Sequence, residues 1–166
     1  MVMPLVPILA AFSMLQQLPR VSGTIVRNSD ELDVHTRHRF EASPLYGSWR
    51  VQHQSESDTW ESYMNGVLTG WEGTMEVDFP SPPYVRLIFP QYLPIWGRYY
   101  DDFIPESVVS VAENRIRLHC RAVDDNSKNS ATLEIDSKNW FPATYSQTNR
   151  GGTRMLEHII VHATPV

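Results

Sequence analysis

Alternation of apolar and polar residues between positions 115 and 136 constrains the fold of this chain more than any other feature of its sequence. Over 115–122 the even positions are apolar and the odd positions are arginine or histidine. Over 131–136 Ala, Leu and Ile alternate with Thr, Glu and Asp, and the turn-forming segment DDNSKN separates the two runs. Because residues two apart share one face of a strand, both runs predict half-buried strands. We therefore expect an antiparallel hairpin with Leu118 and Leu133 buried.

Further runs of strand-forming residues flank this hairpin. They occupy 45–51, 74–79, 84–89 and 155–163, and prolines at positions 80, 82 and 83 predict a turn between the second and the third. Helical spacing of apolar residues predicts short helices over 8–18 and 58–70. The segment 91–106 is rich in aromatic residues without a regular pattern, which predicts a long loop. The expected fold class is mainly β: a small antiparallel β-barrel or strongly curved sheet with one or two short helices.

The length of 166 residues fits one compact fold, and the composition is that of a folding chain, with 42% hydrophobic and 20% charged residues. We predict an N-terminal apolar segment and polar connector over 1–42, followed by a β-barrel-like domain over 43–166. Residues 1–18 are too few to span a bilayer and lack the leading basic residues of a signal peptide. We expect them to pack on the body as a helix that folding does not require. A cytoplasmic location is favoured, with secretion as the alternative.

Charge, cysteine and histidine content limit the partners. A formal net charge of −5 gives no general attraction for phosphate, which argues against nucleic acid. Cys120 is the single cysteine, so no disulfide can form within the chain. His158 and His162 would share a face of a helix, but in a strand they would lie about 13 Å apart, too far for one metal ion. We predict no metal and no cofactor, and the oligomeric state stays open.

The basic face of the predicted hairpin has two interpretations. Arg115, Arg117 and Arg121 could bind a phosphate or carboxylate, because guanidinium groups donate in a planar fork. Alternatively, Glu134 and Asp136 on the next strand could pair with them across a solvated sheet face, and we favour this interpretation. A face turned into a closed cavity would favour ligand binding or catalysis, whereas an open sheet surface would favour nucleic acid or a protein partner.

The run LYGSWRV, residues 45–51, resembles the Gly-x-Trp strand at the start of the lipocalin and fatty-acid-binding (calycin) group. Gly47, Trp49 and Arg50 carry the resemblance. It implies a β-barrel that encloses a hydrophobic ligand, with Trp49 closing one end. The proline-rich and aromatic segment from Pro80 to Pro105 has no counterpart in the simple hairpin series of that group.

A second resemblance points to a different class of protein. The segments SPLYGSWRV and GGTRMLEHI are similar to short stretches of a tombusvirus silencing suppressor that binds small duplex RNA. The spacing between the two segments differs from that of the suppressor. The resemblance implies an RNA-binding function with Arg115, Arg117 and Arg121 facing phosphates.

Binding of a hydrophobic small molecule in a barrel pocket is the function that we predict from the sequence. A cofactor-free cyclase or isomerase acting on a polyketide- or terpenoid-like substrate is one alternative, with His119 and Asp101 as the catalytic candidates. A viral or other interaction protein is the second alternative. Aromatic residues concentrated near a barrel mouth would line the pocket, with one arginine as a polar contact. The predicted ligand-binding residues are Trp49, Trp71, Trp96, Tyr99, Tyr100 and Arg117.

Overall fold

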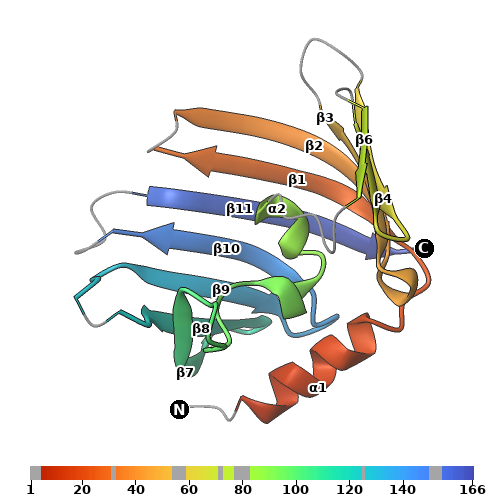
Figure 1. Cartoon of the computed structure of the whole chain (residues 1–166). Helices are drawn as coiled ribbons and strands as arrows, with labels where there is room; N and C mark the ends of the chain where they lie inside the picture. Colours follow the sequence, from red (N-terminus) through yellow and green to blue (C-terminus); the bar gives the residue numbers. More distant parts are fainter. Residues whose placement is uncertain are drawn as a thin grey trace.

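A computed structural model of the chain describes residues 5–30, 33–53, 59–70, 73–76, 83–124, 126–149 and 155–166 (Figure 1). Eleven strands in these ranges form one antiparallel sheet. The strands of the N-terminal half are β1 (Val21–Ser29), β2 (Val34–Ser43), β3 (Ser48–His53), β4 (Trp60–Met64), β5 (Val67–Gly70) and β6 (Gly73–Glu76). Those of the C-terminal half are β7 (Phe103–Ala112), β8 (Arg115–Ala122), β9 (Ser130–Asp136), β10 (Pro142–Thr148) and β11 (Met155–Pro165). The α-helices are α1 (Val6–Leu15) and α2 (Pro83–Arg86), and the short 3₁₀ turns are η1 (Pro44–Tyr46) and η2 (Pro90–Tyr92).

The strand order is that of a meander whose first and last strands are joined. From one edge to the other it runs β6-β5-β4-β3-β2-β1-β11-β10-β9-β8-β7, so each strand lies beside its neighbours in sequence except β6 and β7. The sheet is strongly curved and stays open between β6 and β7 (Figure 1). The prediction of a mainly β, strongly curved antiparallel sheet is therefore confirmed in its open form rather than as a closed barrel.

The predicted central hairpin is confirmed. β8 and β9 pair antiparallel with Leu118 opposite Leu133, and both side chains are fully buried. The alternate residues of both strands point to the other face of the sheet. Arg117 lies opposite Glu134 on that face, so the cross-strand pairing that we favoured from the sequence is present.

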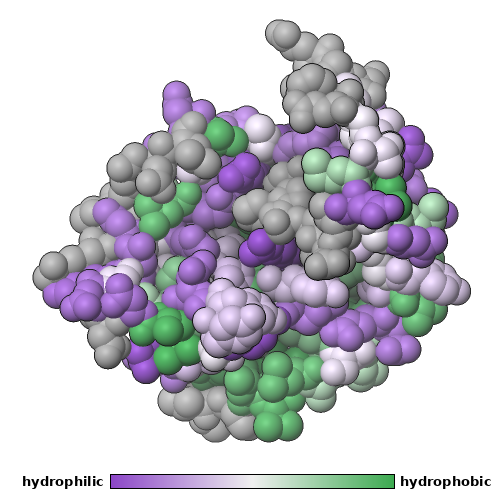
Figure 2. All heavy atoms as spheres, in the orientation of Figure 1, coloured by the Kyte–Doolittle hydropathy of each residue, from purple (hydrophilic) through white to green (hydrophobic). Residues whose placement is uncertain are grey.

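Helix α1 covers one end of the concave face of the sheet. Its inner side buries Ile8, Phe12 and Leu15, while Val6 and Met14 on its outer side are exposed. Figure 2 shows hydrophobic residues gathered at the bottom of the view, where α1 lies in Figure 1. The helix was predicted from the sequence. Because its inner side belongs to the hydrophobic core, we now expect folding to depend on it. No helix in the described ranges is long and apolar enough to cross a membrane.

Three local predictions are wrong. The polar connector predicted within residues 1–42 is largely β1 and β2, and β2 and β3 on either side of residue 43 belong to the same sheet. The helix predicted over 58–70 is the β4–β5 hairpin, because Asn65 and Gly66 both take positive φ, as a two-residue hairpin turn requires. The strand predicted over 84–89 contains instead the end of α2 and a following turn.

Candidate functional site

The concave face of the sheet carries an apolar wall built from both halves of the chain. Strands β1, β2 and β3 contribute one part, and β8, β9 and β11 contribute the other. The strands are curved (Figure 1), and these side chains belong to one hydrophobic core cluster. Fully buried members of the wall are Ile25, Phe40, Val51, Leu118, Leu133 and Ile159.

Residues 83–101, which we call the cover, lie across this wall between β6 and β7 in the sequence (Figure 1). The cover contains α2 and η2 but no strand. Its apolar side chains enter the same core cluster as those of the sheet. The buried apolar residues of the cover are Val85, Leu87, Ile88, Phe89, Leu93 and Ile95. The concave face is thus occupied by the chain's own side chains.

A clasp between Arg98 and Asp101 holds the cover in shape. The Asp101 side chain is 1% exposed and accepts hydrogen bonds from the guanidinium of Arg98 at 2.9 and 3.0 Å and from the backbone N–H groups of Trp96 and Arg98. Arg98 also donates to the carbonyl oxygens of Gln91 and Leu93 at 2.8 and 2.9 Å. The hydrogen bond to Asp101 raises the pKa of Arg98, so the guanidinium stays charged. The clasp therefore binds residues 91–101 into one unit.

Polar side chains occupy the concave face near the C-terminal end of β1. Arg27 on β1 donates to both carboxylate oxygens of Glu157 on β11, at 2.7 and 3.1 Å. Both side chains are largely buried, at 19% and 10% exposure. A bidentate pair of this kind fixes the orientation of both groups. The concave face thus combines an apolar wall with a largely buried ion pair, Arg27–Glu157, near the C-terminal end of β1.

His38 on β2 is a buried neutral histidine beside this ion pair. Its Nε2 lies 2.9 Å from the hydroxyl of Thr36, and its ring packs edge-on against His53 on β3 at a centroid distance of 4.6 Å. Burial lowers the pKa of His38 to about 4, and electrostatic interactions with His53 and Arg27 lower it further. His38 is therefore neutral in the folded protein above about pH 4.

Acidification from pH 6.5 towards pH 4 is expected to destabilise the protein through His38. The pKa of His38 in the folded state lies below its unfolded value of 6.5, so the unfolded chain binds the proton more strongly. The free energy of unfolding therefore decreases as the pH is lowered through this window. A shift of this size corresponds to roughly 3 kcal/mol of unfolding free energy, fully lost near pH 4. The free energy of unfolding, measured in urea at several pH values in this range, should depend less on pH for His38→Gln than for the parent. An exposed-histidine control, His35→Gln, should retain the parental slope, and equal slopes in all three proteins would contradict the prediction.

The predicted aromatic residues that the structure describes lie in different parts of the fold. Trp49 is buried and stacks on Tyr63, whereas Trp96 packs edge-on against Phe12 of α1 and donates its indole N–H to the carbonyl of Pro90. Tyr99 and Tyr100 are 99% and 60% exposed, on the outer side of the cover. Trp71 lies outside the described residues.

Asp101 and His119, the predicted catalytic pair, belong to opposite sides of the sheet. Asp101 is held by the clasp on the concave side. His119 alternates with the buried Leu118 and Cys120, so its side chain lies on the convex face together with Arg117. There Arg117 and His119 line a shallow groove of about 350 Å³ that also includes Glu134 and His158.

The basic residues of β8 lie on the convex surface of the sheet and not in a closed cavity, and Arg117 pairs there with Glu134. His158 and His162 lie in strand β11, not in a helix. No group of three or more His, Cys, Asp or Glu side chains that could hold a metal occurs in the part of the chain that the structure describes. Burial raises the pKa of the Cys120 thiol to about 12, so this cysteine stays protonated.

Sequence reasoning missed the two ion pairs that organise the concave side. Arg27 and Glu157 are 130 positions apart, and nothing in the local sequence of either residue indicates the other. Arg98 and Asp101, in contrast, are separated by three positions in a turn-rich segment, a spacing at which side chains of opposite charge often meet. That spacing was the available signal for the clasp.

Solved structures share this fold, although no protein-family model and no curated protein sequence matches the chain. An uncharacterized conserved protein from Thermus thermophilus superposes with a TM-score of 0.62 at 14% identity, over 97% of this chain and 86% of that one. MucB in complex with MucA(peri) superposes with a TM-score of 0.56 at 12% identity, over 97% of this chain and 55% of that one. The chain thus spans little more than half of MucB.

A LolA superfamily protein, NE2245 from Nitrosomonas europaea, superposes less well, with a TM-score of 0.41 at 10% identity over 98% of this chain and 92% of that one. The first two superpositions show a common fold, a curved open sheet. The calycin resemblance holds only in its coarse form, as a curved antiparallel sheet around an apolar interior.

Proposed function

We propose that the protein binds an apolar ligand, such as an acyl chain, on the concave face of the sheet in place of the cover. The observation that carries this proposal is the nature of the contact between the two. The cover packs on the wall through side chains such as Leu87, Phe89 and Ile95, all essentially fully buried. A ligand made of methylene groups can replace these contacts at a similar gain in buried apolar area.

The internal hydrogen bonds of the cover support movement as a unit. Ile88 and Phe89 donate to the carbonyls of Val85 and Arg86, and the clasp closes residues 91–101 on themselves. At its C-terminal end the cover meets the sheet where Gly97 donates to the carbonyl of Phe103. The bonds within the cover would be kept during an outward movement, whereas the two bonds that join Gly97 and Pro94 to Phe103 would have to break. Opening would then expose chiefly apolar surface, which the ligand would cover again.

The comparisons support a binding role for this fold. MucB, which shares the fold, is known in a complex with MucA. For the present chain, the apolar wall favours a hydrophobic small molecule, and the Arg27–Glu157 pair would contact a polar end of that molecule. Because Asp101 and His119 lie on opposite sides of the sheet, the geometry favours binding over catalysis.

Loosening the clasp is expected to speed ligand binding, because Asp101 holds the backbone on both sides of Gly97, whose N–H group joins the cover to Phe103 of the sheet. A fluorescent fatty acid should bind the parent protein near one-to-one, with slow association limited by opening of the cover. Asp101→Asn keeps the size of the side chain but weakens its bonds to Arg98, and charge-assisted hydrogen bonds contribute about 1.5–3 kcal/mol each. Association, measured by stopped-flow fluorescence, should therefore accelerate about 10-fold or more.

The matched control for this experiment is Tyr99→Ala. Tyr99 lies in the same turn as Asp101 but is 99% exposed, so its removal should leave both rate and affinity unchanged. Absence of binding to both the parent and Asp101→Asn would overturn the proposed function. Equal acceleration by Tyr99→Ala would show that the clasp does not control opening.

A further inference from the structure

Helix α1 is apolar on every side, although only its inner side is buried. Its sequence, VPILAAFSML, contains a single polar residue, Ser13, and residues 1–19 contain no charged residue. A helix that is apolar all round is normally covered all round, by protein or by lipid. With 10 residues α1 is too short to cross a bilayer, which takes about 20. The outer side of α1 therefore has the composition of a covered surface.

The exposed side chains of α1 form one continuous stripe. Val6, Ala10 and Met14 are spaced four apart, which puts them on the same side of the helix, and Val6 and Met14 are 71% and 74% exposed. Leu9 lies beside this stripe and is 45% exposed. The hydroxyl of Ser13 donates to the carbonyl of Leu9 at 3.1 Å. The outer side of α1 can thus leave water without leaving this donor unpaired.

The turn η1 continues the apolar surface beyond the C-terminal end of α1. The backbone N–H of Leu45 donates to the carbonyl of Leu18 at 3.1 Å, which holds η1 beside the end of the helix. Leu45 and Tyr46 are 43% and 75% exposed. Tyrosine is frequent where the apolar interior of a bilayer meets the lipid headgroups. We call this surface the α1 patch; it consists of Val6, Leu9, Ala10, Met14, Leu45 and Tyr46.

We propose that the α1 patch docks the protein on the surface of a zwitterionic lipid bilayer, which supplies the apolar ligand. A stable interface with a second protein takes about 20–30 residues a side, far more than this patch offers. A bilayer needs no matching surface, because a few apolar side chains can enter its outer layer. The net charge of −5 and the uncharged patch give no attraction for acidic lipids.

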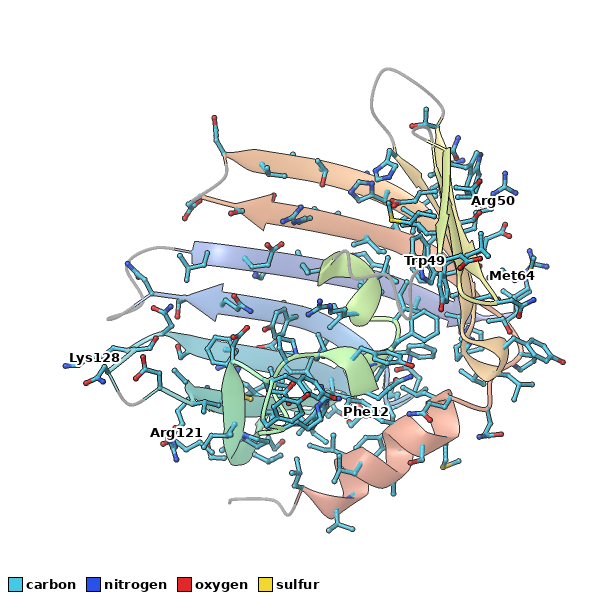
Figure 3. All side chains as sticks on the ribbon, in the orientation of Figure 1. Phe12, Trp49, Arg50, Met64, Arg121 and Lys128 are labelled. Atoms are coloured by element: carbon cyan, nitrogen blue, oxygen red, sulfur yellow. The ribbon has the colours of Figure 1, made fainter. Side chains whose placement is uncertain are left out.

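The position of α1 connects this docking to the cover. Phe12, labelled in Figure 3, lies on the inner side of the helix, and its ring packs edge-on against Trp96 of the cover at a centroid distance of 5.9 Å. The outer side of the same helix carries the α1 patch. A docked molecule therefore holds the cover close to the bilayer, where an acyl chain can be taken up. The choice of the bilayer as the ligand source rests on the function proposed above.

Flotation with phosphatidylcholine vesicles tests the docking. The parent should float with the vesicles, with a weak and reversible affinity near that of one myristoyl chain, about 10⁴ M⁻¹. Met14→Glu should lower the bound-to-free ratio at least 10-fold, because a carboxylate would have to enter the apolar layer. Met75→Glu is the matched control, since Met75 is 58% exposed but lies on β6, away from α1 (Figure 1), and it should float like the parent.

Lipid composition and oligomeric state exclude the competing explanations. Phosphatidylglycerol in the vesicles should not increase binding, and added salt should not weaken it. Binding that requires the acidic lipid would overturn the proposal. Analytical ultracentrifugation without vesicles should show a monomer. A dimer that Met14→Glu dissociates, together with absence of flotation, would assign the α1 patch to a second copy of the chain and would also overturn the proposal.

Fatty-acid binding separates this proposal from the proposed function. In the absence of vesicles, Met14→Glu should bind a fluorescent fatty acid with the parental rate and affinity, because the patch lies on the outer side of α1. Extraction of the same fatty acid from donor vesicles should slow at least 10-fold in Met14→Glu and stay parental in Met75→Glu. A parent that binds the fatty acid but does not float would overturn the docking alone. A parent that floats but binds no fatty acid would overturn the proposed function alone.

Discussion

Deletion of residues 1–18 is expected to abolish the cooperative unfolding transition of the protein. The deletion removes α1 and exposes the part of the sheet interior that it covers. Four side chains on the inner side of the helix, Ile8, Ala11, Phe12 and Leu15, are at most 7% exposed. Burial of a large apolar side chain contributes about 1.5–3 kcal/mol, so the loss reaches roughly 5–9 kcal/mol. That is comparable to the whole stability of a typical domain, about 5–15 kcal/mol.

Single substitutions separate the inner and outer sides of α1. Phe12→Ala should cost about 3–5 kcal/mol in urea unfolding, because it leaves a cavity between the helix and Trp96 of the cover. Met14→Ala should change stability by less than about 0.5 kcal/mol, since Met14 is 74% exposed. A truncated protein with a parental near-UV circular dichroism spectrum and a cooperative transition would show that α1 is an appendage, as the sequence first suggested.

The parts of the fold that were predictable are those specified by local pattern. The hairpin of β8 and β9 has one apolar and one polar face along its whole length, because its inner side chains contact the core at every second position. The closing strand β11 was predicted from its apolar and β-branched residues, because strict alternation fails there: Glu157 faces inward and Ile160 does not. Such alternation can be read without knowing what lies opposite.

Strand β1 was missed because its inner face is only partly apolar. Val21 and Ile25 are fully buried, but the next inward residue is Arg27, whose charge is balanced by Glu157 from the far end of the chain. A local pattern that includes a charge and a glycine suggests a solvated connector. Only the long-range pairing of β1 with β11 makes these residues suitable for the centre of a sheet.

The irregular character of the cover was predictable, but the side chains through which it meets the sheet were not. A shortage of strand signal correctly marked most of 91–106 as irregular, and that segment overlaps the cover. The exposed aromatics Tyr99 and Tyr100 were chosen for their type, whereas the side chains that meet the sheet are aliphatic residues such as Leu87 and Ile95. Which side of an irregular segment faces the sheet depends on its tertiary path, which carries no periodic signature.

Gly23→Ala is expected to destabilise the protein by about 3 kcal/mol, because the added methyl group meets backbone atoms that cannot move aside as well as the Phe40 ring. Gly23 lies in β1, where this strand joins the N-terminal strands to β11 of the C-terminal half. A Cβ atom built on Gly23 would stand 1.8 Å from the carbonyl oxygen of His162 and 2.9 Å from its carbon. β1 and β11 would have to separate locally, with loss of ladder hydrogen bonds at the only connection between the two halves in the described sheet.

Gly70→Ala is the matched control for this substitution. Gly70 also lies in a strand, β5, but the atom nearest to its added methyl group would be the Glu61 Cγ at 3.7 Å, an ordinary contact. Gly-to-Ala changes at compatible positions stabilise by about 0.4–1 kcal/mol, because the unfolded chain loses conformational freedom. Urea unfolding should thus move in opposite directions for the two variants. A parental midpoint for Gly23→Ala would mean that β1 and β11 do not approach closely at this position, and the joined meander would then need a different register.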